Sequence, residues 1–131
     1  MLDASAVVEL VLGLEHGREI ADRIANPAES LHAPHLLTAE VAQVIRRFES
    51  RQRIDADRGA AAITDTTDLD ITYYDHVPLL PRVWTLRRNA TAYDALYLSL
   101  AEALDAPLLT GDSALQAVPG HGALIEVFGS D

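Results

Sequence analysis

Apolar residues recur at helical spacing in several parts of the chain, most clearly between residues 89 and 104. Residues three or four positions apart lie above one another on a helix, so this spacing marks one buried face. In this run the pattern consists of Leu96, Leu100, Ala103 and Leu104. The sequence also predicts helices over residues 4–14, 18–25, 38–51, 79–88 and 113–117, and another that starts at Asp55 or Asp57. We therefore expect several short helices, each with an apolar face.

Short apolar or β-branched runs separate these helices. The predicted strands cover residues 1–3, 31–33, 71–74, 107–110 and 124–128. Strands that alternate with helices favour a mostly parallel sheet covered on both faces. The 131 residues are enough for one core, and no linker or repeat divides them. The sequence thus predicts a single α/β domain over residues 1–131.

Polar residues mark where two of these helices begin. Thr91 and Asp94 stand three residues apart in a capping arrangement, and Thr38 is expected to cap the helix that follows it. In the simplest interpretation, Asp94 is a first-turn carboxylate in favourable contact with the helix dipole. The following strand ends in Thr110-Gly-Asp112, which supplies another carboxylate. Asp94 must therefore be considered together with the other acids.

Four acidic residues occupy the same kind of position. Asp3 and Asp112 each follow a predicted strand and precede a helix, while Glu40 and Asp94 fall in predicted first turns. Strand ends that lead into helices meet at one edge of a parallel sheet, which is where ligands bind. Each acid has the alternative role of cap or dipole partner, a contribution of about 0.5–2 kcal/mol to stability. Their common placement predicts an acidic cluster at that edge.

An acidic cluster of this kind predicts a bound cation. Neighbouring carboxylates raise one another's pKa unless a positive charge lies among them. The chain has no cysteine, and its five histidines lack the spacing of a zinc motif, so the ligands would be oxygens. Oxygen ligands favour Mg²⁺ or Mn²⁺. Such an ion polarises a phosphoryl oxygen or lowers the pKa of a bound water.

Four segments resemble the acidic motifs of PIN-domain ribonucleases. They are Asp3-Ala-Ser5, Thr38-Ala-Glu40-Val41, the run from Thr91 to Glu102, and Leu109-Thr-Gly-Asp112. The segment Tyr93-Asp-Ala-Leu-Tyr97 is the most specific, and its run is most similar to the toxin subunits of VapBC toxin–antitoxin pairs. The chain departs from the family in one respect. Only two residues precede Asp3, whereas the family has a longer strand before this aspartate. Either the first strand is very short, or native residues are missing before Met1.

The resemblance implies a three-layer α/β/α fold with a central, mostly parallel sheet of four to five short strands. It implies an endoribonuclease in which Asp3, Glu40, Asp94 and Asp112 hold Mg²⁺ or Mn²⁺, and in which a metal-activated water hydrolyses an RNA phosphodiester. Ser5 and Thr110 match positions that support the acidic residues, by hydrogen bonds to carboxylates. A role as helix-cap or strand-end hydroxyls stays open for both.

The same resemblance implies the partners. They are RNA, a second copy in a homodimer, and a cognate VapB-like antitoxin whose C-terminal segment covers the acidic site, giving a heterotetramer or a larger assembly. The helices over residues 4–14 and 38–48 are candidates for the groove that receives this segment. The alternative is that their apolar faces belong to the hydrophobic core.

The formal charge of −10 is unusual for a nucleic-acid-binding protein. All ten basic residues are arginines, however, and arginine suits phosphate contacts. The candidates for such contacts are Arg46, Arg47, Arg87 and Arg88, with solvated helix faces as the alternative. Tyr93 and Tyr97 are expected to pack their helix rather than to contact RNA.

Two other functions stay open. The first is a PIN-like module that binds RNA or a protein without cutting. The second is another Mg²⁺-dependent phosphohydrolase, although Ser5 stands where a haloacid-dehalogenase-like phosphatase needs a second acid. A receiver domain would need a lysine, and the chain has none. Since no run of about 18 apolar residues and no signal peptide is found, we expect a cytoplasmic protein without membrane contact.

Overall fold

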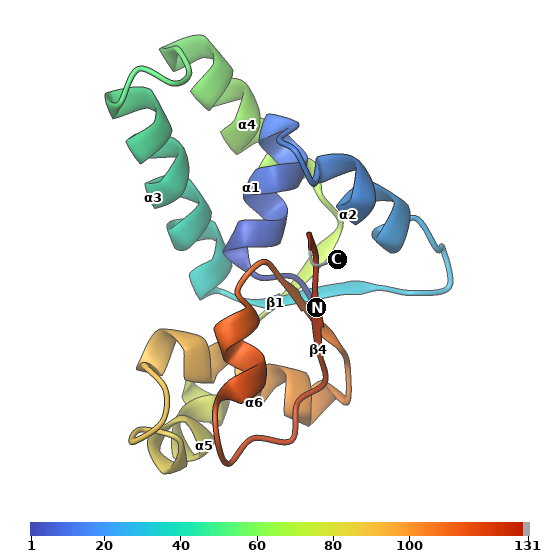
Figure 1. Ribbon diagram of the computed structural model, residues 1–131, viewed down its shortest axis with the longest axis vertical. Helices are drawn as coiled ribbons and strands as arrows, with labels where there is room; N and C mark the ends of the chain where they lie inside the picture. The colour runs from blue at the N-terminus through green and yellow to red at the C-terminus, as the bar shows by residue number, and fades with distance from the viewer. Residues whose placement is uncertain (130–131) are drawn as a thin grey trace.

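The computed structural model, which describes residues 1–129, contains a central set of parallel strands (Figure 1). Strand β1 (Leu31–Pro34) pairs with β2 (Ile71–Tyr74), and β3 (Leu108–Thr110) pairs with β4 (Ile125–Val127). Leu2 joins the two pairs, because its N–H donates to the His32 carbonyl at 3.2 Å and it forms a parallel bridge with Leu109. The N-terminal residues therefore act as a very short central strand.

Helices cover both faces of this sheet, as predicted. Helices α1 to α4 pack against one another on one side, and α5 and α6 lie on the other (Figure 1). Their bounds are α1 Ala4–Leu12, α2 Gly17–Ile24, α3 Leu36–Ser50, α4 Ala56–Asp68, α5 Leu80–Thr85 and α6 Ala92–Leu104, with 3₁₀ turns η1 Val77–Leu79 and η2 Ser113–Ala117. The three-layer α/β/α architecture and the mostly parallel sheet are confirmed. The domain prediction also included residues 130–131, which lie outside the described part.

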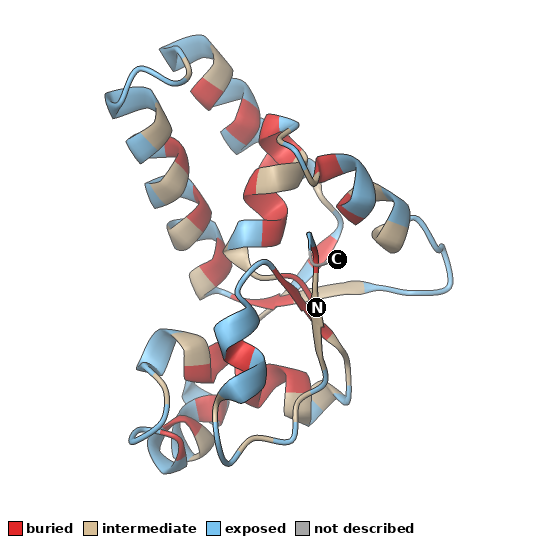
Figure 2. Ribbon diagram, viewed as in Figure 1, coloured by how far each residue is buried: buried red, intermediate tan, exposed pale blue. Residues whose placement is uncertain are grey.

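The buried residues lie mainly on the helix faces and strands that meet between the layers (Figure 2). Helix α6 is the most deeply buried element, since every residue from Ala95 to Ala101 is buried. Ala103 is exposed and was wrongly placed on the apolar face, because the buried run of α6 ends at Ala101. Helix α6 is thus a core helix.

Among residues 1–129, no helix combines the length and apolar character needed to cross a membrane.

Helix boundaries follow local chemistry in three cases. Thr91 caps α6 by accepting the Asp94 N–H at 3.1 Å, as predicted. Asp55, rather than Asp57, caps α4 by accepting the Arg58 N–H at 2.7 Å. Helix α1 ends at Leu12 instead of residue 14, because Gly13 adopts a left-handed conformation with φ of 61°.

The start of α3 corrects two predictions. Thr38 does not cap this helix; its hydroxyl donates to the His35 carbonyl at 3.3 Å. The helix begins at Leu36, whose N–H donates to the His76 imidazole at 3.0 Å, so a residue 40 positions away satisfies the helix end. Glu40 consequently lies beyond the first turn of α3, and its position owes little to the helix dipole.

The predicted helix over residues 79–88 is shorter than expected. Residues 77–79 form the 3₁₀ turn η1, and α5 ends at Thr85. The Leu86 N–H is shared between the Arg82 and Val83 carbonyls at 3.2 and 3.1 Å, which tightens the helix end. Pro81 lies in the first turn of α5, where proline is tolerated.

Candidate active site

Asp3 lies at the end of the central strand and caps α1. Its Oδ1 accepts hydrogen bonds from the Ser5 hydroxyl at 2.6 Å and from the Ala6 N–H at 3.1 Å. Its Oδ2 accepts a hydrogen bond from the Thr110 hydroxyl at 2.5 Å. Burial raises the pKa of Asp3, although the Ser5 and Thr110 hydroxyls oppose that rise. The two hydroxyls thus favour the ionised carboxylate.

Ser5 and Thr110 also tie Asp3 to the loop after β3. The Ser5 hydroxyl oxygen accepts the Gly111 N–H, and the Thr110 hydroxyl oxygen accepts the Asp112 N–H, both at 3.0 Å. Each hydroxyl therefore donates to Asp3 and accepts from this loop. The hydrogen bonds to a carboxylate that were expected of Ser5 and Thr110 are present.

Glu40 reaches the same region from α3. Its Oε1 accepts a hydrogen bond from the Tyr97 hydroxyl at 2.6 Å. Burial raises the pKa of Glu40, and the charges of Asp3 and Asp94 raise it further, while Tyr97 lowers it. Tyr97 is only 4% exposed, so its ring is held firmly in the core while its hydroxyl restrains Glu40.

Asp94 and Asp112 complete the group. Asp94 is half-buried in the first turn of α6, and its pKa is raised by burial and then by the charges of Asp112 and Asp3. Asp112 is exposed and caps η2 by accepting the Ala114 N–H at 2.9 Å. The capping roles considered for Asp3 and Asp112 are therefore real. Capping does not exclude a further role, because each carboxylate has a second oxygen.

Hydrogen bonds through Ser5 and Thr110 join the segments that carry Asp3 and Asp112, and the charges of Asp3 and Asp94 act on Glu40. Asp3, Glu40 and Asp94 each have a raised pKa, and charge repulsion within the group contributes to two of these shifts. Oxygen donors that repel one another suit a hard cation, so the donor chemistry fits Mg²⁺ or Mn²⁺. Among residues 1–129, however, no three histidine, aspartate or glutamate side chains are grouped closely enough to hold a metal ion.

The two tyrosines of the acidic motif differ in how they meet the packing prediction. Tyr97 packs in the core as predicted, but its hydrogen bond to Glu40 was missed. The signal was its position three residues after Asp94, which places both side chains on one helix face. The packing prediction for Tyr93 was wrong, because this ring is 61% exposed.

The candidate arginines are divided between two elements. Arg46 and Arg47 are exposed on α3. Arg87 stacks over the Trp84 ring at 4.5 Å and donates to the Trp84 carbonyl at 2.9 Å, so local contacts already orient its guanidinium. Arg88 is exposed after α5. Phosphate binding by these residues stays a prediction.

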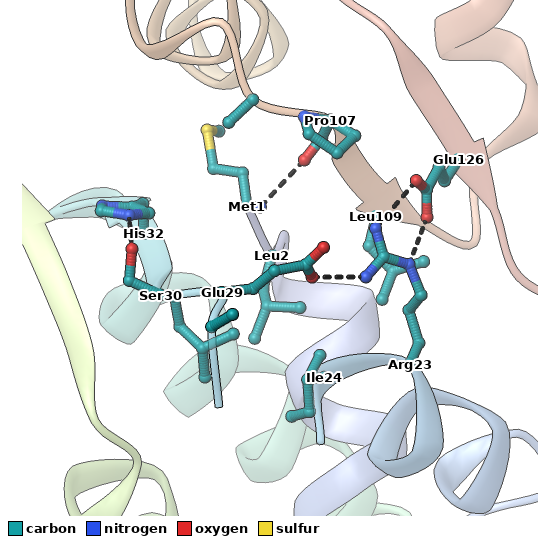
Figure 3. A pocket seen from close by; sticks show the side chains of 13 residues that line it. Met1, Leu2, Arg23, Ile24, Glu29, Ser30, His32, Pro107, Leu109 and Glu126 are labelled. Atoms are coloured by element: carbon teal, nitrogen blue, oxygen red, sulfur yellow. Dashed lines mark hydrogen bonds and ion pairs between the residues drawn. The ribbon is translucent and has the colours of Figure 1, made fainter. Parts of the chain in front are cut away.

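The opposite edge of the sheet holds a cavity of about 250 Å³ (Figure 3). It lies between Leu2, Leu109 and an ion-pair network in which Arg23 donates to Glu126 at 2.8 Å and to Glu29 at 2.6 Å. Arg23 lowers the pKa of Glu126. None of the four candidate carboxylates lines this cavity. Its strongest polar groups satisfy one another, so this network joins α2 to β4.

Comparison with known proteins identifies the family. The family model described as "PIN domain" matches residues 1–121, a range that includes all four carboxylates. The chain belongs to the PIN-domain family. A solved structure described as PAE2754 from Pyrobaculum aerophilum has the same fold, with a TM-score of 0.64, 24% identity, and coverage of 95% of this chain and 86% of that one.

Several relatives of this PIN domain are named ribonucleases from Mycobacterium tuberculosis. Ribonuclease VapC1 is 42% identical over 92% of this chain and 90% of its own length. Ribonuclease VapC9 is 39% identical over 88% of this chain and 87% of its own. Ribonuclease VapC12 is 36% identical over 97% of both chains. The similarity to these relatives extends over most of the chain.

Proposed function

We propose that this PIN domain is an Mg²⁺- or Mn²⁺-dependent endoribonuclease and the toxin of a toxin–antitoxin pair. What supports the proposal is the similarity of most of the chain to named ribonucleases, together with the electrostatic repulsion that Asp3 and Asp94 exert on Glu40 and that Asp112 and Asp3 exert on Asp94. Repelling carboxylates destabilise a fold, so their retention at one edge favours a role in binding a cation.

Asp3, Glu40, Asp94 and Asp112 are the residues that would hold the metal. When bound, the metal supplies a water of lowered pKa and a positive charge beside the phosphodiester. The chain itself supplies orientation. Ser5 and Thr110 hold both oxygens of Asp3, Tyr97 restrains Glu40, and the helix start at Thr91 fixes Asp94.

Activity assays of matched variants test the proposal. We expect Asp94→Asn to abolish cleavage of RNA while the fold persists, because the amide is isosteric but removes a charged metal ligand. Asp65→Asn is the control, since Asp65 is an exposed acid on α4. Excess chelator should silence the wild type. Full cleavage by Asp94→Asn, or full cleavage in chelator, would falsify the proposal.

The partners follow from the same proposal. We infer a VapB-like antitoxin whose C-terminal segment covers the acidic site, a homodimer that gives a heterotetramer or a larger assembly with it, and a cytoplasmic setting. The strip formed by Val77, Leu80 and Trp84 is a candidate dimer contact, because these apolar side chains are 67%, 50% and 66% exposed on η1 and α5. Trp84→Ala should then lower the sedimentation coefficient.

One observation favours a second candidate, a PIN module that binds RNA or a protein without cutting. Within the described residues the acidic side chains do not form a close ligand cluster, and both Asp3 oxygens already accept hydrogen bonds. Calorimetric titration separates the candidates. The nuclease requires saturable Mg²⁺ or Mn²⁺ binding that Asp94→Asn weakens, whereas the inert module predicts no metal-dependent heat.

A further inference from the structure

A groove of about 440 Å³ opens beside Glu40 along α3. Its α3 wall runs from Leu36 to Arg47 through positions three or four residues apart, which form one continuous face of the helix. At 1.5 Å per residue this wall is about 16 Å long. Tyr93, from the start of α6, supplies the remaining lining residue. The groove therefore connects a candidate catalytic carboxylate with an aromatic ring and an arginine.

Apart from Glu40, which accepts the Tyr97 hydrogen bond, the polar side chains of this groove are exposed and lack partners within residues 1–129. Within residues 1–129, the side chains of Arg47, Gln43 and Tyr93 make no hydrogen bond or ion pair with the protein. Arg23 and Arg82 contrast with Arg47, because both are paired with glutamates. Arg47 thus has no acidic partner within residues 1–129 that offsets its charge, in a chain with a formal charge of −10.

An exposed aromatic ring beside a free arginine matches what single-stranded RNA requires. Unpaired bases stack on aromatic side chains, and arginine binds the backbone phosphates. The floor of the groove includes the half-buried aliphatic residues Leu36 and Val44, which suit the flat face of a base. Gln43 adds an amide that donates and accepts hydrogen bonds.

We propose that the groove between α3 and Tyr93 is the subsite for one nucleotide that flanks the scissile bond of single-stranded RNA. Tyr93 stacks on the base, and Arg47 holds the next phosphate. Glu40 and Arg47 are seven residues apart, so their Cα atoms are about 10 Å apart along α3. Glu40 repels phosphate, which places the contact at the Arg47 end. This assignment rests on the proposed ribonuclease function.

The charges along the groove favour RNA over a peptide as its occupant. A peptide basic enough to bind beside Glu40 would be repelled by Arg47 at the far end of the groove. An RNA strand places phosphates at both sides of its base. It therefore meets Arg47 at one end and the proposed metal site at the other.

Binding of a labelled single-stranded RNA oligonucleotide of mixed sequence, followed by fluorescence anisotropy in excess chelator, tests the subsite without cleavage. Loss of one stacked base in Tyr93→Ala should weaken binding about 5- to 150-fold, whereas Tyr93→Phe keeps the ring and should bind like the wild type. Arg47→Ala should reduce the slope of log affinity against log salt by about 0.7, the value for one phosphate on a single strand. Arg18→Ala, an exposed arginine on α2, is the control.

Cleavage kinetics in Mg²⁺ or Mn²⁺ separate this inference from the proposed function. Tyr93→Ala should raise KM and leave kcat nearly unchanged, because a flanking base binds equally in the ground and transition states. If the wild type binds RNA through Tyr93 but never cleaves it, the nuclease proposal fails alone. If it cleaves while Tyr93→Ala and Arg47→Ala bind like the wild type, the subsite fails alone.

Two further outcomes overturn the subsite. One is the absence of RNA binding by the wild type in chelator. The other is unchanged RNA binding by both variants together with weaker inhibition by a protein partner, which would assign the groove to that partner. Both side chains are exposed, so the variants should keep the wild-type Tm, and thermal unfolding checks this.

Discussion

Replacing Tyr97 with phenylalanine isolates a single hydrogen bond at the acidic edge. The ring is 4% exposed and is retained in Tyr97→Phe, so packing should be unchanged. What is lost is the 2.6 Å bond from the hydroxyl to Glu40. A hydrogen bond to a charged group contributes about 1.5–3 kcal/mol to stability. For a chain of 131 residues, a loss of about 2 kcal/mol lowers Tm by about 7 °C.

The loss should depend on pH in a defined direction. The pKa of Glu40 is already raised above its ordinary value of 4.5, mainly by burial, and Tyr97 opposes that rise. Removing the hydroxyl therefore raises this pKa further and destabilises the ionised form. The destabilisation is full above the folded-state pKa of the variant. The difference in stability between the variant and the wild type shrinks as pH falls towards 4.5, because Glu40 then becomes protonated in both folded proteins.

Urea unfolding from pH 4 to pH 8 in chelator measures both effects. Tyr74→Phe is a matched control, because the Tyr74 hydroxyl bonds the His32 imidazole at 2.8 Å instead of a carboxylate. The loss of stability in Tyr74→Phe should be smaller, about 0.5–1.5 kcal/mol, because this hydrogen bond does not involve a carboxylate. If Glu40 must be ionised for RNA cleavage, the acid limb of kcat/KM also moves to higher pH in Tyr97→Phe only. Equal stability of Tyr97→Phe and wild type at pH 8 would refute the reasoning.

Three other substitutions give contrasting results. Glu102→Gln should lower the free energy of unfolding by about 1 kcal/mol at pH 7, because Arg82 lowers the pKa of Glu102. This difference from the wild type should disappear as pH falls through the lowered pKa, which acid unfolding curves would measure. Asp94→Asn should stabilise the metal-free protein at pH 7, since the raised pKa of Asp94 makes its ionised form unfavourable in the fold; a lower Tm in chelator would contradict this. Gly111→Ala should cost about 1–3 kcal/mol in urea unfolding, because the new Cβ would lie 2.8 Å from the buried Phe128 ring.

The sequence predicted the fold class because its local signals agree with the final packing. The Thr91 cap and the strand over residues 71–74 were read correctly from local residues. The start of α3 was not, because the imidazole of His76 satisfies the Leu36 N–H across 40 positions of sequence. A cap supplied from a distant segment leaves no local pattern. The predicted Thr38 cap was wrong for this reason.

The candidate site was predicted at the level of which elements carry it. Strand ends in a parallel sheet share one edge, so Asp3 and Asp112 were expected near each other, and hydrogen bonds through Ser5 and Thr110 do join the segments that carry them. Side-chain pairing did not follow, because Tyr97 meets Glu40 only after α6 has docked against the sheet. The exposure of Tyr93 likewise depends on which face of α6 the core accepts. Whether the four acids bind metal stays a prediction.

The charge distribution bears on the proposed binding of RNA by an acidic chain. Arg23 and Arg82 form ion pairs with glutamates, so their charges are neutralised locally. Arg47 is free and lies beside the groove. Long-range repulsion from the net charge is screened beyond about 8 Å at physiological salt, whereas a contact between Arg47 and a phosphate acts within that distance. RNA affinity should therefore follow Arg47 and depend little on surface acids elsewhere.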